Sequence, residues 1–128
     1  MFQIADMFAS YDSDGRLEVS GYLLFFIVYA VFCPVQELIG RCGAQAPIYA
    51  FLQGSEKQRH LISILTSNLL FAASHSHLNA AFMLVTFLPG LFWGWLFARH
   101  KSLIGVSISH IVIGGYALFA LGLEEFLK

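Results

Sequence analysis

The stretch Pro34-Val35-Gln36-Glu37-Leu38-Ile39-Gly40-Arg41 decides the fold, because it places an acid and a base inside a long apolar segment. No charged residue lies between Glu18 and Glu37. Glu37 and Arg41 are four residues apart, which on a helix puts them on one face, where they can pair. Charged groups at membrane depth are costly and usually functional. The rest of the chain is therefore expected to be arranged around this pair and the histidines that could meet it.

The composition is that of an integral membrane protein. Of the 128 residues, 58% are apolar and 12% are charged, against about 45–50% and about 25% in soluble domains. Thirteen Phe, five Tyr and two Trp contribute to a mean hydropathy of +0.71, and a chain this short could not enclose so much apolar surface in a core. A net charge of −1 gives no support to nucleic-acid binding. The lipid bilayer is the expected surrounding.

The apolar runs predict an all-α, polytopic membrane helix bundle with about four transmembrane helices. These runs are residues 22–40, 61–75, 80–98 and 103–123. An acidic N-terminal segment, residues 1–20, would precede a transmembrane helical core of residues 21–128. Pro34 is expected to kink the first helix, and residues 42–52 either continue that helix or lie at the membrane interface. The basic residues between the runs favour a cytoplasmic location for those loops, with both ends outside.

Three other features have ordinary interpretations. Cys33 and Cys42 are too far apart along one helix for an unstrained disulfide. The run Asp12-Ser-Asp14-Gly15 is similar to a calcium loop, but its register puts Ser10 and Gly21 at ligand positions, so an exposed turn is favoured. The N-terminus lacks the pattern of a cleaved signal peptide, so the first span is expected to act as the insertion signal.

Polar side chains recur at membrane depth and form a site-like set. They are Gln36, Glu37, Arg41, His75, His77 and His110. Any one of them is more often an interhelical hydrogen bond than a site, but a carboxylate, an arginine and histidines on three helices favour a common site. Zinc is an alternative occupant by ligand type. Because no H-E-x-x-H pair is present and His-x-His on a helix splays its side chains, we expect neither a metal nor a cofactor.

In order, these motifs resemble a known family. E-x-x-x-R is followed by Phe71-x-x-x-His75, by Gly90-x-x-x-Gly94-Trp-x-Phe-x-Arg99 and by His110 in the last apolar helix. The chain resembles the CPBP family of CAAX-protease and bacteriocin-processing, or abortive-infection, intramembrane endopeptidases over about residues 30–115. The resemblance implies a multi-pass protein of a bacterial inner membrane.

The resemblance also implies roles for individual residues. In the family a first motif E-E-x-x-x-R supplies a general base that shares water activation with the histidine of the second motif, and a final H-x-x-x-N stabilises an oxyanion. Glu37 and Arg41 match the first motif, His75 the second and His110 the last. Two positions depart from the pattern, because Gln36 replaces the first Glu and Gly114 replaces the final Asn.

These departures leave two functions open. Gln36 can orient water but cannot take its proton, and loss of a general base typically lowers the rate by about 10²–10⁴. The first hypothesis is therefore a catalytically impaired scaffold that acts as a binding or structural subunit with other transmembrane proteins. The alternative is an active intramembrane endopeptidase in which His75, with Gln36 or Glu37, handles water while His110 steadies the oxyanion. The resemblance implies a family form with more helices, so partners could supply missing walls.

Overall fold

The described part of the chain consists of helices and short connections and contains no strand, which confirms the predicted all-α class. The computed structural model describes the backbone of residues 19–119 and the side chains of residues 23–118. Its elements are α2 (Val19–Glu37), the π-helix η1 (Leu38–Gln45), α3 (Ala46–Phe51), α4 (Glu56–Ser74), α5 (Ala80–His100) and α6 (Leu103–Phe119). Residues 1–18, which include the calcium-like run and nearly all of the predicted acidic segment, lie outside the described residues. So does the end of the fourth predicted span.

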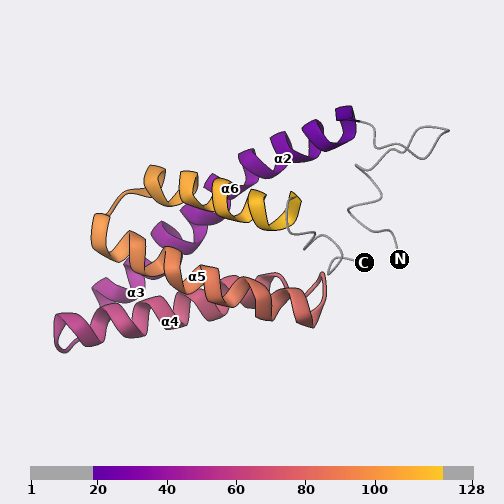
Figure 1. Ribbon diagram of the computed structural model, residues 1–128. Coiled ribbons are helices and arrows are strands. Elements are labelled where there is room, and N and C mark those ends of the chain that lie inside the picture. Colours follow the sequence, from indigo (N-terminus) through magenta and orange to yellow (C-terminus); the bar gives the residue numbers. More distant parts are fainter. Residues whose placement is uncertain (1–18, 120–128) are drawn as a thin grey trace.

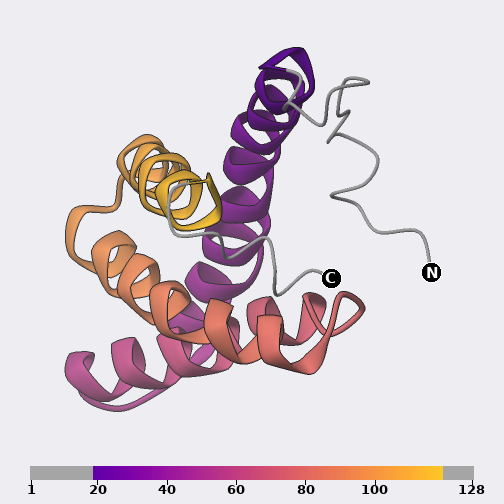
Figure 2. The same cartoon turned by 45° about the vertical axis from the view of Figure 1, so that its right-hand side comes forward.

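The helices form two antiparallel pairs that meet around η1. A short turn connects α4 to α5, and these two helices pack along each other (Figure 1). The other pair is α2 and α6, which lie side by side in both views (Figures 1 and 2). The π-helix η1 follows α2 directly and contacts both α4 and α5. This element therefore joins the two pairs at the point where the sequence places its charged residues.

The first apolar run forms one continuous helix, Leu23–Phe51, that passes through both of its prolines. Pro34, where we expected a kink, lies inside α2, and the π-helical turns come after it, in η1. There the backbone N–H of Ala46 donates to the carbonyl of Arg41, five residues earlier, which is the π-helical register. Two glycines with low helix propensity lie in this segment, and it ends just before Pro47, which has no N–H to donate. The segment after residue 41 thus continues the helix.

Within residues 19–119, two helical stretches are long and apolar enough to cross a membrane, judged by length and composition. They are Leu23–Phe51 and Ala80–His100, while Leu103–Leu118 is apolar but shorter. Along α2 and into η1 a stripe of large apolar side chains is exposed at helical spacing, namely Leu24, Ile27, Val31, Val35 and Ile39. Such a stripe suits contact with lipid. These features are those of a membrane protein. The number of spans, predicted to be four, stays a prediction.

The ends of the helices are fixed by local hydrogen bonds. Ser55 and Gln58 form a capping box at the start of α4, and the side chain of Asn79 accepts a hydrogen bond of 2.7 Å from the N–H of Phe82 at the start of α5. Lys101 ends α5 in the left-handed conformation, with φ of 53°. These caps satisfy backbone groups that a helix end leaves open. They fix the residues at which α4 begins and at which α5 begins and ends.

Candidate functional site

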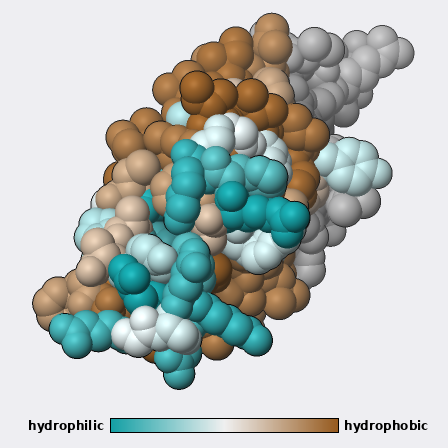
Figure 3. All heavy atoms as spheres, turned by 90° about the vertical axis from the view of Figure 1, so that its left-hand side faces the viewer, coloured by the Kyte–Doolittle hydropathy of each residue, from teal (hydrophilic) through white to brown (hydrophobic). Residues whose placement is uncertain are grey.

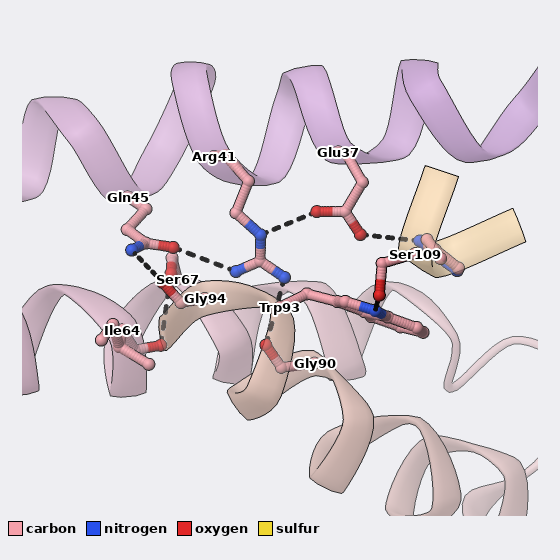
Figure 4. Close-up of polar contacts among 10 residues, drawn as sticks. Glu37, Arg41, Gln45, Ile64, Ser67, Gly90, Trp93, Gly94 and Ser109 are labelled. Carbon is pink, nitrogen blue, oxygen red and sulfur yellow. Dashed lines mark hydrogen bonds and ion pairs between the residues drawn. The ribbon is translucent and has the colours of Figure 1, made fainter. Parts of the chain in front are cut away.

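Glu37 is the centre of a fully buried polar network (Figure 4). One carboxylate oxygen accepts from Arg41 Nε at 2.8 Å and the other lies 2.6 Å from His110 Nδ1. Glu37 and Arg41 both have 0% exposure. A carboxylate paired with a guanidinium is an acceptor, so Nδ1 of His110 carries the proton and donates it. The contact with His110 joins the end of α2 to α6, and the predicted Glu37–Arg41 pairing is present.

Arg41 extends the network from η1 to α5. Its Nη1 donates to Gln45 Oε1 at 3.1 Å and its Nη2 to the carbonyl of Gly90 at 3.2 Å. Gln45 in turn donates to the carbonyl of Gly94 at 2.8 Å. All three guanidinium nitrogens therefore have a partner. A planar guanidinium can donate to three separate acceptors in this way, whereas the compact ammonium of a lysine is less suited to it. Glu37, Arg41 and Gln45 lie four residues apart and so point to the same side of the helix.

The two glycines of the G-x-x-x-G motif permit this close approach. A Cβ on Gly94 would lie 3.0 Å from Ile64 Cγ2 and 3.1 Å from Arg41 Nη1, and one on Gly90 would overlap the side-chain oxygen of Asn68. Asn68 is fully buried and donates to the carbonyl of Phe87 at 2.7 Å. The face that carries the two glycines is thus a packing surface, and it also exposes two carbonyls as acceptors for the network.

Aromatic rings enclose His110. Its ring stacks on Trp93 with centroids 3.9 Å apart and planes 19° apart, and the indole N–H of Trp93 donates to Ser109 Oγ at 3.3 Å. The ring centroids of Phe71 and Tyr29 each lie 6.1 Å from that of the imidazole, with the ring planes nearly perpendicular to it. Nδ1 is held by Glu37, while no described residue bonds to Nε2. Nε2 is therefore the nitrogen of His110 that can still form a hydrogen bond to a substrate or to water.

Tyr29 occupies the space that a side chain at position 114 would need. A Cβ built on Gly114 would overlap the Tyr29 hydroxyl and lie 3.1 Å from its Cζ. The same hydroxyl donates to the carbonyl of His110 at 3.4 Å. A phenol hydroxyl from α2 therefore lies beside His110, in the space next to Gly114. Sequence reasoning missed Tyr29, although it shares with Glu37 the i, i+4, i+8 face that includes Cys33.

His75, Gln36 and His77 are not hydrogen-bonded to this network. His75 ends α4, and its Nδ1 bonds to the carbonyl of Phe71 at 2.8 Å, leaving Nε2 without a described partner. Its ring lies 4.8 Å from that of Phe71, so one phenyl ring contacts both His75 and His110. Gln36 is partly exposed and forms no hydrogen bond within the described residues, and the exposed His77 bonds to the carbonyl of Ser74 at 2.6 Å.

The network is built for holding helices together more than for binding an ion. Within residues 19–119, no three His, Cys, Asp or Glu side chains gather in a way that could hold a metal, so the zinc alternative gains no support.

Cys33 is buried and Cys42 exposed, and both are free thiols. Gln45 was missed, yet the extended spacing E-x-x-x-R-x-x-x-Q is visible in the sequence and would have predicted its place on the same face.

The geometry can be set beside known proteins. A family profile described as type II CAAX prenyl endopeptidase Rce1-like matches residues 19–116, from the start of α2 to near the end of α6. No curated protein and no solved structure matches the chain. The matched range contains every residue of the network.

Proposed function

This chain belongs to the Rce1-like family of type II CAAX prenyl endopeptidases, and from that premise we propose that it is a catalytically impaired member. It keeps the family's helical scaffold and serves as a binding or structural subunit among other transmembrane proteins. In this proposal the protein crosses a bacterial inner membrane several times.

The state of Glu37 carries the proposal. Both carboxylate oxygens are engaged, one by Arg41 and one by His110, and the side chain is fully buried. If Glu37 accepted a proton from water, the buried guanidinium would lose its counter-ion, and breaking a buried pair costs about 3–5 kcal/mol. The adjacent Gln36 is more accessible but has no basic group. Neither residue of this motif is therefore suited to act as the general base.

A second candidate, an active endopeptidase, rests on the two histidines that contact Phe71. His75 donates from Nδ1 to the Phe71 carbonyl, so its Nε2 holds a lone pair and could take a proton from water. His110 donates from Nδ1 to Glu37, and it could donate from Nε2 to an oxyanion as an imidazolium beside that carboxylate. Gln36 would then orient the water. This arrangement needs His75 to supply all of the base function.

Cleavage of a prenylated CAAX peptide by the purified chain in proteoliposomes distinguishes the two functions. We expect no cleavage by the wild type, binding of the peptide, and a gain of cleavage in Gln36→Glu. His77→Ala is the matched control for His75→Ala, because His77 is two residues away and exposed. Wild-type cleavage that His75→Ala abolishes and His77→Ala preserves would establish the endopeptidase instead.

The subunit role has its own test. We expect the wild type, purified from native membranes in mild detergent, to retain a stoichiometric transmembrane partner. Purification as a lone chain, with no such partner in several mild detergents, would contradict the structural role even if cleavage is also absent.

A further inference from the structure

A cluster of cations surrounds one tyrosine ring at the end of the molecule away from the Glu37 network. The guanidinium carbon of Arg59 lies 4.2 Å from the centroid of the Tyr49 ring and Lys101 Nζ lies 5.1 Å from it. His60 stacks on the same ring at 4.3 Å, with planes 24° apart. The cluster brings together α3, the first turns of α4 and the connection between α5 and α6.

The backbone positions these cations. Arg59 donates from Nε and Nη2 to the carbonyl of Tyr49, at 3.2 and 3.0 Å, at the end of α3. Lys101 is fixed by its left-handed conformation and by its own N–H, which donates to the Phe97 carbonyl at 2.8 Å. Nη1 of Arg59 has no described partner, and the Lys101 side chain is exposed. Both cationic ends therefore remain available to a ligand.

An acid, Glu56, pairs with His60 of this cluster, but its two permanent cations have no acid partner among the described residues. In the part of the chain that the structure describes, neither Arg59 nor Lys101 forms an ion pair, and the acid nearest in sequence, Glu56, contacts His60 at 3.6 Å. Lys57 and Arg99 add further positive charge near this end. A cation–π contact is worth about 0.5–1 kcal/mol at an exposed site, which does not remove the mutual repulsion of two cations around one ring. An anion bound to both cations would offset that repulsion.

The surroundings point to a lipid as the source of that anion. Figure 3 looks at this end and shows hydrophilic residues gathered there with hydrophobic surface on either side. Phe51 is 89% exposed and Ile104 75%. Aromatic and basic side chains at a helix end are typical of headgroup depth, and basic pockets between membrane helices bind lipid headgroups.

We propose that Arg59 and Lys101, arranged around Tyr49, bind the phosphate of an anionic phospholipid headgroup, while the neighbouring exposed apolar side chains contact its acyl chains. A choline or ethanolamine headgroup fits less well, because its own cation would be repelled by the cluster. This site is independent of the proposed function, since none of its residues belongs to the Glu37 network.

Lipid-dependent unfolding of the full chain tests the site. In nanodiscs we expect added phosphatidylglycerol to raise the thermal midpoint above that in phosphatidylcholine alone, and native mass spectrometry to detect retained phosphatidylglycerol. Lys101→Gln should reduce the rise by more than half and weaken retention. The matched control is Lys57→Gln, which removes the same charge from an exposed residue that does not contact Tyr49, and it should keep most of the rise.

Each contrary result has a definite meaning. No rise with phosphatidylglycerol would overturn the site, and equal losses in Lys57→Gln and Lys101→Gln would replace it by diffuse surface charge. Glycerol 3-phosphate and inorganic phosphate, added to phosphatidylcholine nanodiscs, form the second arm. If either stabilises the protein as well as phosphatidylglycerol does, the ligand is a free phosphate and the lipid assignment is wrong.

Discussion

Replacing Glu37 by Gln should destabilise the bundle strongly although it changes hardly any volume. The amide oxygen can still accept from Arg41, but the amide NH2 then faces His110 Nδ1, so the bond that Nδ1–H donates to the carboxylate is lost unless the imidazole changes tautomer. More importantly, the guanidinium of Arg41 keeps its charge at 0% exposure and loses its counter-ion. The substitution therefore measures how much the charge of Glu37 contributes to stability, with little change in packing.

The size of the effect follows from burial. Both partners are inaccessible to solvent, so screening does not reduce the interaction. Removing one partner of such a pair costs about 3–5 kcal/mol, and the weakened bond to His110 adds about 1 kcal/mol. The double variant Glu37→Gln/Arg41→Met leaves no buried charge. It should be less destabilised than Glu37→Gln alone, as expected for residues in direct contact.

Reversible unfolding in bicelles by sodium dodecyl sulfate, followed by near-ultraviolet circular dichroism, measures these free energies. Cys42→Ser is the control, because Cys42 lies on η1 beside Arg41 but is exposed, and it should change stability by less than about 0.5 kcal/mol. A loss below about 1 kcal/mol in Glu37→Gln, or a double variant less stable than the single one, would refute the counter-ion reasoning.

Two further predictions concern glycines and use the same unfolding assay. Gly114→Ala should destabilise by about 1–3 kcal/mol, because the new Cβ overlaps the Tyr29 hydroxyl, and Tyr29→Phe in the same chain should recover part of the loss by removing that atom. Gly90→Ala should destabilise to a similar extent through its overlap with Asn68. Gly43→Ala is the control, since its Cβ would meet only the Leu38 carbonyl at 3.8 Å. Equal losses at the three glycines would contradict this packing explanation.

The helices and the central ion pair could be predicted because each depends on local spacing. Long apolar runs give the helices, and Glu37 and Arg41 pair within one helix at four residues. Gly90 and Gly94 could be identified as a packing face for the same reason. What they pack against could not be read from the motif, because Ile64 and Asn68 come from another helix.

The π-helical register and the partners of the histidines could not be predicted. Whether a backbone bond closes over four or five residues has no clear signature in the sequence, and in this chain it governs how Gln45 reaches α5. The expected common site included both His75 and His110, but only His110 is hydrogen-bonded to Glu37. That difference depends on how α6 lies along α2 and where α4 ends, which are properties of the whole bundle.

The four-residue spacing of Glu37 and Arg41 also bears on how the chain enters its membrane. N-terminal segments emerge first during synthesis, so the first helix meets the bilayer before α5 and α6 exist. Because acid and base lie on the same helix, that helix can partition into lipid as a self-neutralised unit. The later helices then complete the network through two glycine carbonyls and the His110 ring. The acid and the base therefore enter the membrane with their charges already paired.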